Sequence, residues 1–238
     1  MESVKGKNIL IVGATGRIGS LATKLLCGSG AHVFMSGRNP EKLKEVAENY
    51  EIDQDRLFVV DLCNEDSIQE MGKQIHEKIP QIDILVNAAG TGILKPVENL
   101  TYLEFVNTIQ TNLTGPFLLI KTFLPRMKEA RRGLIINIPG VLGKVPMAGS
   151  AAYSASKYGV VGMLQSVREE IKRTDIRITN LFLGGTDTPF WDHIDLRIQK
   201  DKMIKPEDAA RAIWFLCQQP ASAVVNEMVL QPFNHQAI

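Results

Sequence analysis

Tyr153 and Lys157 are the pair of side chains in this sequence best suited to acid–base chemistry. They lie four residues apart in the segment Ala151 to Lys172, whose apolar spacing predicts a helix, so both point to one face of it. A free tyrosine titrates near pH 10, roughly, but an adjacent ammonium favours the phenolate and lowers that pKa. Such a pair is also common on helix surfaces, so its meaning depends on its surroundings.

A glycine-rich turn offers a place for a phosphate-bearing ligand. The turn Gly13-Ala14-Thr15-Gly16-Arg17-Ile18-Gly19 follows an apolar run and precedes a helical pattern. Glycines permit a tight turn and close backbone approach, so the free N–H groups and positive dipole end of the helix can meet a pyrophosphate. We therefore expect dinucleotide binding here, although a simple strand-to-helix turn is the alternative.

The segment after the second apolar run indicates which dinucleotide is preferred. Sites specific for NAD usually place an acidic residue there, against the ribose 2′-hydroxyl, whereas this chain has Ser36-Gly37-Arg38-Asn39. Arg38 offers a planar, permanently charged fork for a 2′-phosphate, and Arg17 supplies a second cation. We expect NADP(H) rather than NAD(H); the alternative is that both arginines are solvated surface residues.

These groups need strands to position them, and apolar runs rich in Val, Ile and Leu recur along the chain. Helices covering both faces of a parallel sheet produce such continuous runs, and the intervening stretches are long enough for crossover helices. The sequence thus predicts an α/β, Rossmann-like, doubly wound parallel sheet of about seven strands with helices on both faces. The predicted strands are Asn8 to Val12, His32 to Ser36, Leu57 to Val60, Ile82 to Asn87, Leu134 to Ile138, Ile176 to Leu183 and Val225 to Leu230.

Helical patterns lie between these strands. They cover Ser20 to Cys27, Glu41 to Asn49, Glu65 to Lys78, Tyr102 to Ala130 and Ala151 to Lys172, and Pro206 opens another. The longest irregular stretch, residues 184–203, follows the sixth strand and is a candidate substrate lid. With no interdomain linker visible, we expect one dinucleotide-binding domain over residues 1–238.

Bulk properties exclude several classes of protein. The 238 residues are 45% hydrophobic with a formal net charge of +1, and no run of Lys and Arg is dense enough to follow a nucleic-acid backbone. The N-terminus shows no signal peptide or membrane span, so we expect a cytoplasmic protein. Cys27, Cys63 and Cys217 are widely spaced, which predicts reduced thiols and no metal site.

Several spaced motifs together resemble those of the short-chain dehydrogenase/reductase family over nearly the whole chain. The matching positions are Asp61-Leu62, which correspond to the family's adenine-contacting pair; Leu85-Val86-Asn87-Ala88-Ala89-Gly90, which is similar to its Asn-Asn-Ala-Gly motif; Asn112; the Tyr153 and Lys157 pair; and Gly184 through Thr188, including Thr186 and Thr188, which resembles the loop that holds the nicotinamide carboxamide.

The resemblance implies a mechanism and a substrate class. NADPH would deliver hydride to a carbonyl carbon while Tyr153 gives a proton to the oxygen. Lys157 would hold the nicotinamide ribose and depress the pKa of the tyrosine, and a water near Asn112 and the lysine would relay protons. The implied partner is a small carbonyl or alcohol substrate, in a ketoreductase-like reaction.

Three positions depart from the family's pattern. Gly140, in Ile138-Pro139-Gly140-Val141, stands where the family usually has its catalytic serine. Loss of one such donor costs on the order of 100- to 1000-fold in rate, and rescue by Ser150 would need an unusual arrangement. The glycine turn has the spacing Gly-x-x-Gly-x-x-Gly, so Arg17 stands where the short form of the family has its middle glycine. Leu183 replaces the proline of the family's usual Pro-Gly pair after the sixth strand.

The lid and the Tyr153 helix carry lesser signals. Trp191 is a candidate substrate contact, although Phe190 and Trp191 together could simply pack onto the body. His193 is expected to be solvated and without a role. Small residues at Ala151, Ala155, Gly159 and Gly162 suit the helix contacts of a homodimer or homotetramer as well as intrachain packing.

Two other functions remain open. Gly140 and the spacing of the glycine turn would suit a nucleotide-binding regulator or inactive subunit, although the intact Tyr153 and Lys157 argue against it. An isomerase or dehydratase using the same fold with a retained cofactor is the second alternative.

Overall fold

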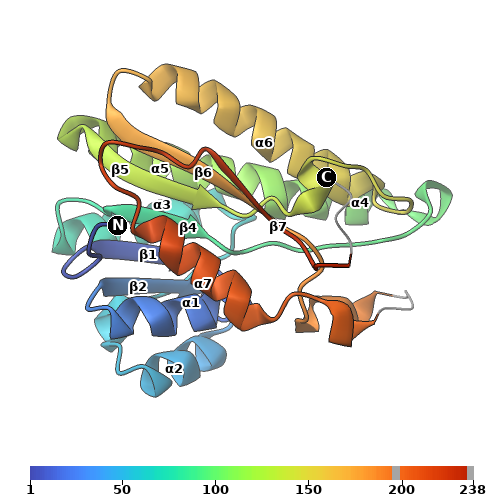
Figure 1. The fold of residues 1–238 in the computed structure, drawn as a ribbon, viewed down its shortest axis with the longest axis horizontal. Helices are drawn as coiled ribbons and strands as arrows, with labels where there is room; N and C mark the ends of the chain where they lie inside the picture. The colour runs from blue at the N-terminus through green and yellow to red at the C-terminus, as the bar shows by residue number, and fades with distance from the viewer. Residues whose placement is uncertain (195–198, 235–238) are drawn as a thin grey trace.

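A seven-stranded parallel sheet with helices on both faces forms the protein (Figure 1). The computed structural model describes residues 1–194 and 199–234. The strand order is β3-β2-β1-β4-β5-β6-β7, so the chain winds outward in one direction from β1 and in the other from β4. This confirms the predicted Rossmann-like class.

The strands lie where the apolar runs place them. Their bounds are β1 Asn8–Val12, β2 His32–Gly37, β3 Leu57–Val59, β4 Ile84–Asn87, β5 Arg132–Asn137, β6 Asp175–Leu183 and β7 Glu227–Leu230. Alternate residues of a strand enter different cores: Ile9 and Ile11 pack with Leu26 on one face, whereas Leu10 packs with Phe123 on the other. Burial on both faces is the reason that the runs are continuous.

The helices form the two covering layers. Their bounds are α1 Arg17–Gly28, α2 Pro40–Asn49, α3 Glu65–Lys78, α4 Tyr102–Ile109, α5 Gly115–Ala130, α6 Ala151–Ile171 and α7 Pro206–Cys217. Residues of α1, α2 and α7 share one core and residues of α3, α5 and α6 the other. No helix in the described residues is long and apolar enough to cross a membrane.

The predicted helix from Tyr102 to Ala130 is wrong in its continuity. A π-helical turn, Gln110–Thr114, separates α4 from α5. Pro116 has no N–H to give to the carbonyl of Asn112, and its ring crowds that carbonyl, so the regular hydrogen-bond ladder cannot pass this point. The wider turn begins just before it, and it carries Asn112, one of the predicted site residues.

The ends of the parallel strands determine where a site can form. Because the strands all run the same way, Gly13 after β1, Gly37 at the end of β2, Asn87 at the end of β4 and Gly184 after β6 meet at one edge. β1 and β4 are the strands between which the winding reverses, and ligands of such sheets bind in the crevice outside this point. The candidate site residues lie along that edge.

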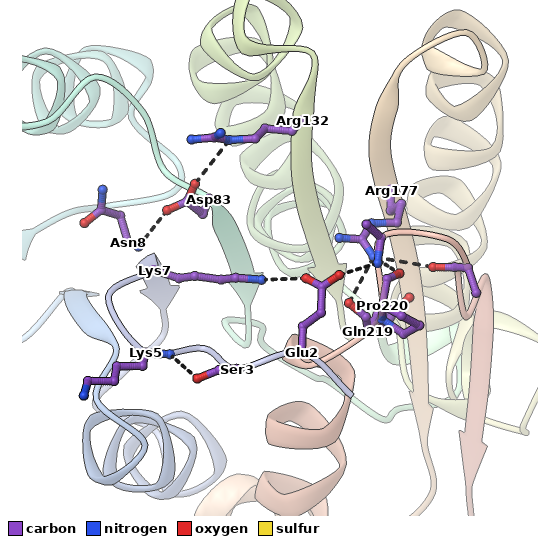
Figure 2. A network of polar contacts seen from close by, with 12 residues as sticks. Glu2, Ser3, Lys5, Lys7, Asn8, Asp83, Arg132, Arg177, Gln219 and Pro220 are labelled. Atoms are coloured by element: carbon purple, nitrogen blue, oxygen red, sulfur yellow. Dashed lines mark hydrogen bonds and ion pairs between the residues drawn. The ribbon is translucent and has the colours of Figure 1, made fainter.

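At the opposite edge a polar network ties the N-terminal segment to the turn between α7 and β7 (Figure 2). The Glu2 carboxylate accepts hydrogen bonds from the backbone N–H of Ala221, at 2.5 Å, and from the Lys7 ammonium, at 3.2 Å. Arg177 on β6 donates to the carbonyls of Gln219 and Pro220 in the same turn. The hydrogen bond from Ala221, and after it the one from Lys7, hold the pKa of Glu2 below its usual range.

We expect Glu2→Gln to lower the free energy of unfolding by less than about 1 kcal/mol, because the group is partly exposed and solvent screens it. The folded-state pKa of Glu2 is depressed, so its contribution is complete above the unfolded value of about 4.3 and is lost as the pH falls through the folded value. Urea unfolding of wild type and Glu2→Gln at pH 7 and pH 3 measures the difference in unfolding free energy at each pH. Glu45→Gln, on the exposed face of α2, is the control, and an equal loss at both pH values would contradict the assignment.

Candidate active site

A cavity of about 460 Å³ opens at the edge where the strands end. Most of the residues predicted from the sequence to bind cofactor or substrate line it, although they come from five separate segments of the chain. The predicted residues in its lining are Thr15, Gly16, Arg17, Ile18, Ala89, Gly90, Gly140, Tyr153, Lys157, Thr186, Thr188 and Trp191.

The glycine turn provides the floor of the cavity. Gly13 has φ +83°, and a Cβ there would lie 2.6 Å from the backbone nitrogen of Ala89. A Cβ at Gly19 would lie 2.3 Å from the carbonyl oxygen of Gly13, so α1 can approach β1 only because both residues are glycine. Helix α1 begins after Gly16 with no side-chain cap and no acidic residue in its first turn. Its first N–H groups therefore suit a dinucleotide pyrophosphate.

Three cations lie on the segments expected to meet a ribose 2′-phosphate: the glycine turn, the end of β2 and the first turn of α2. Arg38 is exposed at the end of β2 and does not line the cavity. Arg17 lines it, but its guanidinium donates to the Glu207 carboxylate on α7 at 2.9 Å. Lys42, in the first turn of α2, also lines the cavity. Lys42 was not predicted as a site residue, because its only signal in the sequence is its place one turn after Arg38.

Tyr153 and Lys157 lie together on α6, as their spacing predicts. The Lys157 Nζ is 5.3 Å from the centroid of the Tyr153 ring and donates to the Ile138 carbonyl at 3.3 Å. Burial raises the pKa of Tyr153 to about 12 and lowers the pKa of Lys157 to about 8. The expected lowering of the tyrosine pKa by the cation is therefore wrong for the protein without cofactor, because desolvation of the phenolate outweighs the attraction. At neutral pH the phenol keeps its proton.

Asn112 connects the π-helical turn to the site. Its amide donates to the Thr91 carbonyl at 2.7 Å and to the Ser156 hydroxyl at 3.0 Å, and its oxygen accepts from the Thr91 N–H at 2.9 Å. A Cβ on Gly90 would meet that oxygen at 3.2 Å and the Lys157 Nζ at 3.3 Å. Asn112 thus fixes the backbone after Gly90 beside Lys157. Its expected support of a water stays a prediction.

Gly140 has a backbone conformation that explains its residue type. Its φ of +70° and ψ of 167° fall in a region essentially restricted to glycine. A Cβ there would lie 3.8 Å from the Tyr153 hydroxyl and 3.5 Å from the Leu183 carbonyl, so space exists for a small side chain but the backbone disfavours it. The hydroxyl of Ser150 is bonded to Met147 and Ser154, which leaves it unsuited to replace a serine at Gly140.

Other predicted residues lie beside the cavity rather than in its lining. The Asp61 carboxylate accepts from the Cys63 N–H, and Leu62 is buried against Gly115. The Asn87 amide donates to Asn137 at 2.9 Å, which joins the ends of β4 and β5. These contacts give each residue a structural role, and their predicted contacts with a nucleotide stay predictions.

The described part of the predicted lid forms one side of the cavity. Phe190 and Trp191 lie in a short 3-10 helix, Pro189–His193, and the Trp191 indole donates to the Thr186 carbonyl at 2.9 Å. Phe190 packs against Tyr153 with ring centroids 5.8 Å apart. Trp191 was the predicted substrate contact, but Phe190 is the ring beside Tyr153. The predicted lid residues 195–198 lie outside the described residues.

Val141 and Leu142 complete this side of the cavity. They follow Gly140 in a 3-10 turn. The sequence analysis did not select them because apolar residues after a strand carry no signal that separates a pocket lining from core. In the described residues no group of three His, Cys, Asp or Glu side chains could hold a metal ion.

Comparison with known proteins places this geometry in a family. The sequence profile of the short chain dehydrogenase family matches residues 7–198. An uncharacterised oxidoreductase of Staphylococcus saprophyticus is 30% identical over 235 residues, covering 98% of this chain and all of the relative.

Solved structures share the fold as well as part of the sequence. A metagenomic short-chain oxidoreductase in complex with NADP is 29% identical, with a TM-score of 0.83 over 97% of this chain and 99% of that one. The 3-ketoacyl-(acyl-carrier-protein) reductase of Brucella melitensis, complexed with NADH, is 25% identical with a TM-score of 0.89 over 97% and 99%. The acid–base pair and the glycine turn meet in one site at the edge of a Rossmann-like sheet, and the family profile covers most of the chain. This chain belongs to the short-chain dehydrogenase family of oxidoreductases.

Proposed function

We propose that this protein reduces a carbonyl group of a small molecule with NADPH. The observation that carries the proposal is the position of the protonated Tyr153 phenol and the Lys157 ammonium beside one cavity that also contains the uncapped end of α1. A phenol that keeps its proton at neutral pH is suited to donate it to a substrate oxygen.

Each residue has a definite task in this reaction. The bound nicotinamide supplies the hydride. Tyr153 donates its proton to the carbonyl oxygen, and Lys157 holds the cofactor ribose and stabilises the phenolate that remains. Asn112 keeps the Thr91 backbone and Ser156 in place beside them. The reverse direction oxidises an alcohol with the same groups.

The residues around the glycine turn fit a dinucleotide with a 2′-phosphate. Arg38, Lys42 and Arg17 supply positive charge, and no acidic residue occupies the end of β2. Among solved relatives, one is in complex with NADP and another with NADH, so the family alone does not decide the preference. The charges at these positions favour NADPH.

A catalytically impaired regulator is the second candidate, favoured by Gly140, which offers no hydroxyl to the substrate oxygen. Consumption of NADPH with a panel of ketones, acyl thioesters and quinones separates the two. The reductase oxidises NADPH in proportion to product, whereas the regulator binds it without turnover.

We also propose a single domain in a cytoplasmic homodimer or homotetramer. The outer surface of α4 and α5 exposes Tyr102, Leu103 and Phe117, and a Cβ at Gly162 on α6 would meet no atom within 4 Å, which leaves room for a neighbouring helix. Gly159, by contrast, packs against Leu113 of its own chain. Sedimentation measures the assembly directly.

The preference for NADPH generates the first prediction for the site. Arg38→Asp should lower the ratio of NADPH to NADH affinity by about ten- to hundredfold, because a charge-assisted contact is worth roughly 1.5 to 3 kcal/mol. Fluorescence titration gives both dissociation constants. Arg173→Asp makes the same change in net charge far from the site, and an unchanged ratio in Arg38→Asp would show that Arg38 does not read the phosphate.

Lys42 permits a sharper version of the same titration. Lys42→Ala should also lower the ratio, whereas Lys44→Ala, which removes an exposed lysine paired with Glu48 on the same helix, should leave it near the wild-type value.

The acid–base pair generates a second prediction. Tyr153→Phe should abolish turnover and leave NADPH affinity nearly intact, since it removes only the hydroxyl, whereas Lys157→Ala should lower both. Steady-state rates and NADPH titration measure the two effects. Tyr158→Phe is the matched control, because its hydroxyl donates to the Lys144 carbonyl outside the cavity. A wild-type rate in Tyr153→Phe would mean that another group supplies the proton.

Gly140 generates a third prediction. Gly140→Ala and Gly140→Ser should each lose about 1–3 kcal/mol of unfolding free energy, because both need the backbone conformation that favours glycine. Only the serine adds a donor near the substrate oxygen, so Gly140→Ser should turn over simple ketones faster than Gly140→Ala and modestly faster than wild type. Thermal unfolding and kinetics on both variants separate strain from chemistry. A folded serine variant no faster than wild type would refute the incomplete oxyanion site.

A further inference from the structure

Phe190 lies on Gly92, in the loop after β4. A Cβ on Gly92 would be 2.2 Å from the Phe190 Cζ, so the ring keeps this position only because residue 92 has no side chain. The ring also packs against Tyr153, at 5.8 Å between centroids and an angle of 46°. A lid residue is thereby held directly beside the proposed proton donor.

Trp191 fixes another side of the Phe190 ring. The two rings meet edge to face, with centroids 5.2 Å apart, and the indole is held by its bond to the Thr186 carbonyl. Phe190 is still only half-buried and lines the cavity. Aromatic side chains favour offset or edge-to-face contact with further rings, so the part of Phe190 that faces the cavity suits a flat group.

Few of the described lining residues are charged. The charged residues that line the cavity are Arg17, Lys42 and Lys157, among the described residues. The first two lie at the glycine turn and α2, and the Lys157 ammonium is directed to the Ile138 carbonyl. The lining also contains the uncharged residues Gly140, Val141 and Leu142, and Gly140 lies near the Tyr153 hydroxyl. A carboxylate placed there would lose its hydration without gaining a partner.

We propose that Phe190 determines substrate specificity, and that the substrate carries a flat, uncharged aryl or conjugated group next to the reacting carbonyl. This inference rests on the proposed carbonyl reduction, because it uses Tyr153 to place the substrate oxygen. The flat group packs between Phe190 and the Val141–Leu142 turn, and the oxygen points to the Tyr153 hydroxyl.

Three substrates test the proposal: phenyl methyl ketone, cyclohexyl methyl ketone and a 2-oxo acid with a short alkyl chain. Their intrinsic reactivities differ, so the ratios of kcat/KM are compared between each variant and wild type. The phenyl and cyclohexyl ketones match in size and differ in flatness. With NADPH, wild type should show the largest kcat/KM for the phenyl ketone and the smallest for the oxo acid. Phe190→Leu should reduce the phenyl-to-cyclohexyl ratio roughly three- to tenfold, the value of one aromatic pair.

Gly92→Ala is the second variant, because its added methyl forces the Phe190 ring out of position without changing that side chain. It should reduce the same ratio. Phe215→Leu, on the exposed side of α7, is the matched control and should leave the ratio at the wild-type value.

Three outcomes would overturn the proposal. If Phe190→Leu accelerates all substrates equally, the ring only restricts access to the site. If the phenyl-to-cyclohexyl ratio of kcat/KM is unchanged, the ring does not contact the substrate. If wild type prefers the oxo acid, a cation lies on this side of the cavity. Calorimetric binding of 1-phenylethanol and 1-cyclohexylethanol to the NADP⁺-saturated protein provides a readout without turnover. If no ketone is reduced, the proposed function fails, and the same two variants still decide the aryl preference by binding.

Discussion

The close approach of three backbone segments at the glycine turn is the constraint on which the site depends. Gly13 contacts the Ala88–Ala89 backbone after β4, and Gly19 contacts the Gly13 carbonyl, at separations that leave no room for a Cβ. This contact brings the uncapped end of α1 next to the end of β4, at the point where the winding of the sheet reverses. A methyl group at either glycine would separate α1 from the sheet and displace the floor of the cavity.

The acid–base pair depends on a second set of buried contacts. α6 places Tyr153 and Lys157 one turn apart, but the environment of the pair comes from the loop after β4, which Asn112 holds through Thr91. Burial in these surroundings favours the neutral forms of both groups, so the phenol retains its proton and the lysine gives up its charge more readily. Contacts within the protein hold both side chains, through the Ile138 carbonyl for Lys157 and the Phe190 ring for Tyr153.

Gly140 and Phe190 show how the proposed substrate side of the cavity differs from the proposed cofactor side. The cofactor side is built from turns and helix ends whose backbone groups face the cavity, whereas the substrate side is built from apolar side chains on two short 3-10 turns. The positive φ of Gly140 directs one of these turns, and the missing side chain at Gly92 admits the ring of the other. Both glycines therefore shape the pocket through the space and backbone freedom they provide.

The sequence by itself determined the seven strands, the sheet class, the glycine turn and the pairing of Tyr153 with Lys157, because each depends on local spacing or on burial along one segment. Local spacing carries no information on contacts between distant segments. Only the tertiary structure decided that Glu207 pairs with Arg17, that Lys42 lines the cavity, and that Phe190 rather than Trp191 lies beside Tyr153. The break between α4 and α5 was also decided by the tertiary structure, since helical periodicity continues across the π-helical turn. Asn112 lies in that turn and bonds residues on other segments. The pKa of Tyr153 was likewise set by three-dimensional burial, which outweighs the sequence neighbour four residues away.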